Sequence, residues 1–185
     1  MVCFDCPQRP ANGGACYVTV FQAPRAVWVA YRAGRYPRLD VKGFAAVFSA
    51  RKIRFGAWGE PVLIPLRILR AMARVSEGWT GYTHQWRRRE YRAYQQYLMA
   101  SVDNPAEYAA AKELGWRTFR CRTADQELVS HEIVCPASEE AGYRSTCAQC
   151  RLCSGVAGPA DPRKDIAIVV HGAKAKNFVA LASIA

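Results

Sequence analysis

Short apolar segments alternate with amphipathic segments along most of the chain. The short segments are rich in β-branched and aromatic residues, and they predict strands at 52–56, 79–84, 97–101, 118–121 and 165–171. The longer segments have helical spacing and end near Gly or Pro, and they predict helices at 23–32, 63–75, 106–114 and 174–185. Residues 44–48 fit either a strand or the end of a helix.

This alternation predicts an α/β fold. We expect a partial barrel or a small open sheet of about five to six mostly parallel strands, with crossover helices. Residues 1–185 are expected to form a single domain, with cysteine-rich loops at 3–17 and 135–155. In such sheets ligands bind at the carboxyl ends of the strands, so the turns there are the places to look for a site.

Composition narrows the class of protein. No apolar run reaches the roughly 20 residues of a spanning helix, which argues against a membrane protein. No leader sequence precedes the first cysteines, and a chain of 185 residues can bury its own core without disulfides. We therefore expect reduced thiols and a cytoplasmic location.

The formal charge of +11, mostly from arginine, favours nucleic acid or another polyanion as partner.

Four cysteines in the carboxyl-terminal half carry the most specific signal. Cys147, Cys150 and Cys153 follow one another at intervals of three, and Cys135 precedes Pro136 upstream. This spacing is typical of iron–sulfur ligation and predicts a 4Fe-4S cluster. Zinc, which accepts four thiolates, is the alternative metal. We call Cys135, Cys147, Cys150 and Cys153 the four-cysteine group.

Cys3, Cys6 and Cys16 offer three further thiolates, and we call them the three-cysteine group. Three ligands leave one coordination position open, which is what a catalytic metal needs. A fourth ligand could come from a histidine or from the other group; the histidines are His84, His131 and His171. Cys121 stands alone on a predicted strand and is expected to be a plain buried residue.

Polar residues follow the predicted strand at 79–84. His84 and Gln85 stand between two aromatic residues, in the sequence Gly81-Tyr-Thr-His-Gln-Trp86. At a strand end they are candidates for proton transfer or for binding a planar ligand. A strand histidine is also commonly a hydrogen-bonded structural residue. His171, which ends the most apolar strand, has the same two interpretations.

A cluster of arginines comes next and is predicted to lie on a helix that begins after Trp86. It comprises Arg87, Arg88, Arg89 and Arg92, with tyrosines between and after them. Such a surface suits a nucleic-acid backbone with stacked bases. The alternative is an ordinary solvated helix whose tyrosines pack inward.

Two resemblances add to this interpretation. Cys16-Tyr17 followed by Gly59-Glu60-Pro61 after a strand is similar to radical S-adenosylmethionine enzymes, whose three-cysteine loop precedes a Gly-Gly-Glu-Pro turn. The resemblance implies that Gly59, Glu60 and Pro61 bind the cofactor's amino group. The cysteine spacing departs from that pattern, and one of the paired glycines is missing.

Nearly the whole chain resembles a family of uncharacterised cysteine-rich phage and plasmid proteins, itself distantly similar to radical-enzyme barrels. The matching segments include Gly14-Ala-Cys-Tyr17, Gly81-Tyr-Thr-His-Gln-Trp86, and Cys135-Pro136 through Cys153 to His171-Gly172. The resemblance implies an iron–sulfur protein of a mobile element. Two functions stay open: a minimal radical-type enzyme, or a non-catalytic metal-stabilised module that binds nucleic acid or a host protein.

Overall fold

A single open sheet of six parallel strands organises the protein. The computed structural model describes residues 2–182, with side chains described up to residue 178. The sheet order is β1-β2-β3-β4-β6-β5, and every neighbouring pair runs parallel. The strands are β1 (Lys52–Phe55), β2 (Gly78–Thr83), β3 (Met99–Val102), β4 (Thr118–Arg122), β5 (Glu132–Val134) and β6 (Asp165–Val169). The predicted α/β class and open parallel sheet are confirmed.

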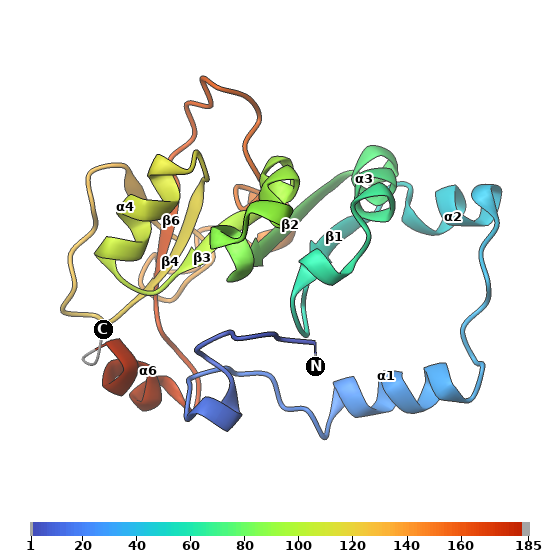
Figure 1. Ribbon diagram of the computed structural model, residues 1–185, viewed down its shortest axis with the longest axis horizontal. Coiled ribbons are helices and arrows are strands. Elements are labelled where there is room, and N and C mark those ends of the chain that lie inside the picture. The colour runs from blue at the N-terminus through green and yellow to red at the C-terminus, as the bar shows by residue number, and fades with distance from the viewer. Residues whose placement is uncertain (1, 183–185) are drawn as a thin grey trace.

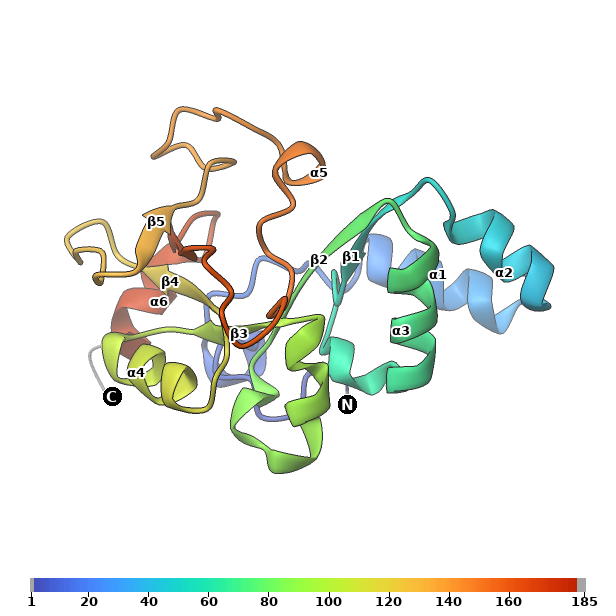
Figure 2. The same ribbon diagram turned by 90° about the horizontal axis from the view of Figure 1, so that it is seen from above.

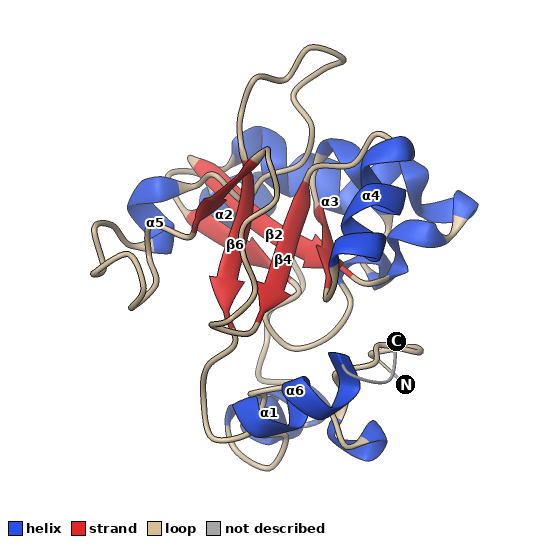
Figure 3. Cartoon of the chain, turned by 90° about the vertical axis from the view of Figure 1, so that its left-hand side faces the viewer, coloured by secondary structure: helices blue, strands red, loops and turns tan. Residues whose placement is uncertain are grey.

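Helices connect most of the strands. They are α1 (Ala23–Arg32), α2 (Val41–Phe48), α3 (Leu66–Val75), α4 (Pro105–Glu113), α5 (Cys147–Cys150) and α6 (Ala175–Ala182), with 3-10 turns at Pro10–Asn12, Pro61–Leu63, Gln85–Arg87 and Arg89–Gln96. Figures 1 and 2 show α3 and α4 over one face of the sheet, with α5 and its loop on the other. Figure 3 shows α1 and α6 beyond the carboxyl ends of β4 and β6.

Local sequence explains where several helices begin. Asn104 accepts a hydrogen bond from the Glu107 N–H at 2.9 Å, and Pro105 stands in the first turn of α4. The carboxylate of Asp40 caps α2 in the same way through the Gly43 N–H. Residues 44–48, which fitted either element, therefore belong to a helix.

Two cores cover the two faces of the sheet. The helix face buries side chains that include Leu69, Trp86, Leu98 and Trp116. The opposite face packs Met99 and Ile166 against Cys135 and Cys153, so the four-cysteine group is part of this second core.

Three local predictions were wrong or incomplete. The helix predicted at 63–75 begins at Leu66, because Pro65 separates it from a 3-10 turn. The helix predicted after Trp86 is instead two 3-10 segments, Gln85–Arg87 and Arg89–Gln96. Strand β5 was not predicted, and residues 183–185 of the last predicted helix lie outside the described residues. Within residues 2–182, no helix is long and apolar enough to span a membrane.

Candidate active site and cysteine groups

The turn after β1 receives the start of the chain. Gly59 has a φ of +124°, and a Cβ at this position would lie 2.9 Å from the carbonyl oxygen of Val2. That same carbonyl accepts a hydrogen bond from the Glu60 N–H at 2.8 Å. Glycine is therefore needed at position 59, because the amino-terminal segment crosses the turn in close contact.

Glu60 joins the carboxyl ends of two strands. Its side chain is buried; Oε2 accepts a hydrogen bond from the Thr83 hydroxyl at 2.6 Å, and Oε1 accepts one from the His84 N–H at 3.0 Å. Each carboxylate oxygen keeps further lone-pair capacity. Within the turn predicted to hold a cofactor, Glu60 is thus a fixed hydrogen-bond acceptor. It lies at the edge where parallel sheets bind ligands.

The three-cysteine group lies at this turn. The pKa of Cys3 is raised by burial, and then by the neighbouring thiols of Cys6 and Cys16 and by the Glu60 carboxylate. Backbone hydrogen bonds shape the loop, with the Cys6 N–H donating to the Cys3 carbonyl and the Cys16 N–H donating to the Gln8 carbonyl. The structure therefore places the three thiols in the neighbourhood of Glu60, which lies 44 or more residues away in sequence, but within residues 2–182 they do not form a group that could hold a metal ion.

His84 is the histidine closest to this group. Its Nδ1 lies 3.5 Å from the Cys6 sulfur and 3.5 Å from Glu60 Oε1, and its Nε2 lies 3.9 Å from Asp103 Oδ2. Burial by itself would lower the pKa of His84, but the hydrogen bonds to Cys6 and Glu60 and the charge of Asp103 raise it well above its usual value. The imidazole is thus held between a thiol and two carboxylates.

The other predicted candidates for the fourth ligand lie elsewhere or serve other contacts. His131 precedes β5 and lies 3.3 Å from the Arg163 carbonyl, and His171 contacts the Val169 carbonyl from an exposed position. Cys121, expected to be a plain buried residue, is half-buried, and its pKa is raised by burial and then by the charges of Asp103 and Cys6. A fourth thiol is therefore near the three-cysteine group.

Gln85 and His84 present unpaired polar atoms beside a small cavity. The Gln85 amide donates to Asp5 Oδ1 at 2.7 Å, which leaves its Oε1 without a hydrogen bond among residues 2–182. His84 Nε2 is likewise buried without a hydrogen-bond partner in that part of the chain. Both residues line a cavity of about 110 Å³ that Asp5 and Arg88 also border. A polar ligand that reached these two atoms would not have to replace a protein hydrogen bond.

Two residues that support this site were missed from the sequence. Gln8 Nε2 donates to Asp103 Oδ2 at 2.8 Å, and Gln8 Oε1 accepts from the Ala15 N–H at 3.2 Å. Gln8 thereby fastens the cysteine loop to the end of β3. Asp103 directly follows a buried strand, which was the available signal; Gln8 belongs to no recognisable pattern.

The four-cysteine group lies on the opposite side of the sheet from α3 and α4. All four cysteines line one pocket, whose floor includes Thr80 of β2 and Ile166 of β6. Cys135 and Cys153 are buried, whereas Cys147 is exposed at the start of α5. Burial raises the pKa of Cys153 to about 12, against a hydrogen bond from Tyr82 that lowers it.

The buried members of this group are held by the sheet. The Cys135 N–H donates to the Ala167 carbonyl at 2.8 Å, which continues the pairing of β5 with β6. The Gly81 N–H of β2 donates to the Cys153 carbonyl at 3.0 Å. Thr146 and Gln149 form a capping box that begins α5. Two thiols are therefore fixed on the sheet and two lie on a short surface helix.

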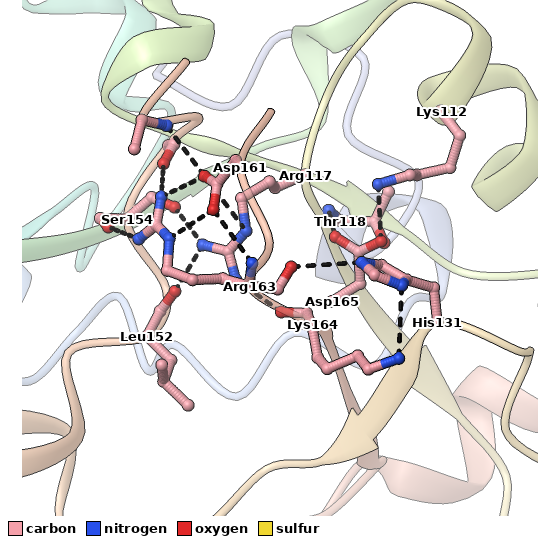
Figure 4. A network of polar contacts seen from close by, with 12 residues as sticks. Lys112, Arg117, Thr118, His131, Leu152, Ser154, Asp161, Arg163, Lys164 and Asp165 are labelled. Carbon is pink, nitrogen blue, oxygen red and sulfur yellow. Dashed lines mark hydrogen bonds and ion pairs between the residues drawn. The ribbon is translucent and has the colours of Figure 1, made fainter. Parts of the chain in front are cut away.

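Two arginines, Arg117 and Arg163, hold the segment of chain that follows the four-cysteine group (Figure 4). Arg117 donates to the carbonyls of Leu152 and Ser154 at 2.7 and 2.8 Å. Arg163 donates to the Ser154 hydroxyl at 2.7 Å and to Asp161 Oδ1 at 2.8 Å. These bonds fix the backbone on both sides of Cys153.

The cysteines converge without forming a closed ligand set. In residues 2–182, no three His, Cys, Asp or Glu side chains are arranged as a group that could hold a metal ion. All eight cysteines are free thiols, however, and soft thiolates are the donors that iron–sulfur clusters and zinc require. The donor chemistry of the four-cysteine group fits such a centre, and closing the set requires the α5 thiols to approach the two fixed ones.

Half of the arginine cluster is engaged within the protein. Arg87 pairs with Glu107 at 2.7 Å, and Arg88 pairs with Asp5 at 3.2 Å. Arg89 and Arg92 are exposed. Because Arg88 lies between two 3-10 segments, the four arginines do not lie on one helix as predicted.

Comparison with known proteins adds no relative: no protein-family model, curated protein or solved structure matches the chain.

Proposed function

We propose that the protein binds iron–sulfur clusters and acts as a minimal radical S-adenosylmethionine-type enzyme. The observation that carries the proposal is the meeting of Cys3, Cys6 and Cys16 with Glu60 at the carboxyl edge of the sheet. The order of the motifs in the sequence does not by itself bring them together, because their proximity depends on how the chain folds. We further propose that the protein belongs to a mobile element and works in the cytoplasm, where reducing conditions keep thiols free.

The two cysteine groups suit different roles. The four-cysteine group has enough thiolates to complete a 4Fe-4S cluster and would hold an auxiliary one. The three-cysteine group leaves a position open beside Glu60, as a reactive cluster requires. When bound there, a 4Fe-4S cluster would supply one-electron chemistry toward S-adenosylmethionine.

The neighbouring residues would bind and orient the cofactor and substrate. Glu60 keeps acceptor capacity for an ammonium group after its bonds to Thr83 and His84. Both residues line the cavity, and Gln85 Oε1 and His84 Nε2 have no protein hydrogen bond in the described chain. Gln85 would orient the substrate, and His84 would hold or move a proton at Nε2.

Metal and sulfide analysis of protein purified without oxygen tests the proposal. A brown protein with about eight irons and matching sulfide is expected for two 4Fe-4S clusters. Under reduction, such protein should convert S-adenosylmethionine to methionine and deoxyadenosine. A colourless protein that carries zinc and no sulfide would overturn it.

The second candidate is a metal-stabilised module that binds nucleic acid or a host protein. It is favoured by exposed arginines, which include Arg89 and Arg92. It predicts steeply salt-dependent binding that survives replacement of Glu60. The two functions are compatible, because the arginines lie outside both cysteine groups.

A further inference from the structure

Helix α1 exposes an apolar surface that the rest of the protein does not cover, and α2 is covered only in part. Neither α1 nor α2 contains a buried residue, and Figures 1 and 2 show both helices at one side of the molecule, away from β3 to β6. Trp28 is 56% exposed and Tyr31 is 62% exposed. A ten-residue helix is only marginally stable in water by itself, so a partner that covered α1 would stabilise it. We call residues 21–42 the arm.

The aromatic rings of the arm are arranged with arginines along one stripe. Arg25, Trp28 and Arg32 stand at helical intervals of three and four, so they share a face of α1. The Trp28 and Tyr31 rings are stacked, with centroids 5.7 Å apart, and the Arg32 guanidinium lies 5.7 Å above the Trp28 ring. The exposed ring therefore has a cation on both neighbouring turns.

The same chemistry continues beyond the helix. Gly34, with a φ of +67°, ends α1 and turns the chain. The next four residues are Arg35, Tyr36, Pro37 and Arg38, of which Tyr36 is 51% exposed. Exposed arginines and aromatic side chains thus continue from α1 into the segment that follows it.

Basic residues are concentrated in and around the arm. Between residues 18 and 54 the sequence has eight of its 26 basic residues and one of its 15 acidic residues. That acid, Asp40, accepts a hydrogen bond from the Gly43 N–H at the start of α2. Within residues 2–182, no carboxylate forms an ion pair with the four arginines of the arm. Those four are Arg25, Arg32, Arg35 and Arg38. By contrast, Arg87 and Arg88 are paired.

We infer that the arm binds single-stranded nucleic acid, with phosphates on its arginines and bases stacked on Trp28 and Tyr36. Guanidinium groups pair with phosphate and also stack on bases, and open aromatic faces accept unpaired bases of any sequence. A duplex hides its base faces from such rings. A second copy of this chain would place like charges opposite one another, which disfavours self-association through this surface.

No residue of the arm belongs to either cysteine group, so this inference does not depend on the iron–sulfur proposal. The net charge led us to expect a nucleic-acid partner. This inference places the binding site for that partner on the arm and not on the Arg87 to Arg92 cluster. The two surfaces can be compared directly in one binding experiment.

The test is fluorescence anisotropy with a labelled 20-nucleotide oligo(dT), titrated with the intact protein at several salt concentrations. Trp28→Ala should weaken binding roughly 5- to 150-fold, the range for loss of one base stack. Arg25→Gln and Arg35→Gln should each flatten the slope of log K against log salt by about 0.7. Trp28→Phe, which keeps a ring, should retain most of the affinity. Circular dichroism should show all of these variants folded, since α1 buries no side chain.

The comparison variant is the double replacement Arg89→Gln with Arg92→Gln, which removes the exposed half of the other cluster. If this variant still binds the oligonucleotide, the result supports the arm as the binding surface. The inference is overturned if Trp28→Ala binds like the wild type, or if the Arg89 and Arg92 replacements abolish binding while the arm variants do not. It is also overturned if anionic vesicles bind the arm and the oligonucleotide does not, or if the arm only mediates dimerisation.

Discussion

The Tyr82 side chain lies beside the thiol of Cys153, and burial and then this thiol raise the pKa of Tyr82. The guanidinium of Arg54 lies 5.7 Å from the centre of the Tyr82 ring, and it donates a hydrogen bond to the Tyr17 hydroxyl at 2.8 Å. Tyr17 directly follows Cys16 in the sequence. Three side chains therefore connect the two cysteine groups across the face of the sheet.

Replacing Tyr82 with Phe should weaken metal binding at the four-cysteine group. Outer hydrogen bonds orient metal ligands, and their loss typically lowers affinity about 10- to 100-fold. Titration with Co²⁺, followed by thiolate-to-cobalt absorption, measures this affinity whichever metal is native. Tyr143→Phe is the matched control, since Tyr143 is exposed in the same cysteine-rich loop. Equal cobalt affinity of wild type and Tyr82→Phe would show that the hydroxyl does not position Cys153.

Replacing Glu60 with Gln should destabilise the folded protein by about 1–3 kcal/mol. The amide keeps one acceptor oxygen, so either the Thr83 hydroxyl or the His84 N–H loses its buried partner. Urea unfolding measures the change. Glu90→Gln, at an exposed position, should stay within about 0.5 kcal/mol of wild type. If both variants unfold alike, the Glu60 carboxylate does not join the two strand ends.

The fold was predictable where local pattern and burial agree. Five of the six strands follow from their apolar and β-branched residues, and the last of them, β6, is buried over most of its length. Strand β5 escaped prediction because it has three residues and begins with Glu132. That glutamate is buried only because Arg120, two strands away in the sheet, pairs with it at 2.6 Å. A buried ion pair of this kind leaves no hydrophobic pattern in the sequence.

The site was predictable in its motifs but not in its contacts. The resemblance to radical S-adenosylmethionine enzymes associated the loop ending at Cys16-Tyr17 with the turn at Glu60, and in the structure the amino-terminal segment lies against that turn. The bond between Gln8 and Asp103 joins residues 95 positions apart, and neither belongs to a motif. The Arg87 to Arg92 segment is not one helix because Arg88 has an extended backbone (φ −79°, ψ 124°) that separates two 3-10 segments.

The stability that Asp161 supplies should depend on pH. Its hydrogen bond from Arg163, together with backbone donors, holds the pKa of this carboxyl well below its usual range. A group with a lowered folded pKa stabilises the protein above its unfolded pKa, and that stabilisation is lost as the pH falls through the folded pKa. Asp161→Asn should therefore cost about 1.5–3 kcal/mol at pH 7. The difference from wild type should shrink below about pH 4.

Denaturant unfolding of wild type and Asp161→Asn at pH 7, 5 and 3 measures this dependence. A difference that stays constant over the three pH values would mean that the ionised carboxylate is not the stabilising group. Asp125→Asn is the matched control, because Asp125 lies in an exposed turn. Its pKa is also lowered, by the hydrogen bond from Thr123, but no arginine pairs with it in residues 2–182.

Adding a methyl group at Gly155 should release the four-cysteine group from the sheet. A Cβ there would lie 2.2 Å from the Gln95 carbonyl oxygen and 2.3 Å from the Tyr97 nitrogen, so the backbone itself must move. Gly155 is two residues after Cys153, whose carbonyl is bonded to the Gly81 N–H. We expect Gly155→Ala to lower the free energy of unfolding by about 1–3 kcal/mol, as overpacking does, and to lower cobalt affinity at the same group.

Gly158→Ala supplies the control in the same segment, because nothing lies within 4 Å of the position its Cβ would take. Removing the conformational freedom of that glycine should leave stability unchanged or raise it slightly. Equal thiol reactivity and cobalt affinity in the two variants would mean that the contact of Gly155 with Gln95 and Tyr97 does not fix the cysteines. Faster reaction of the Cys153 thiol in Gly155→Ala alone would show that this close backbone contact holds the buried half of the four-cysteine group in place.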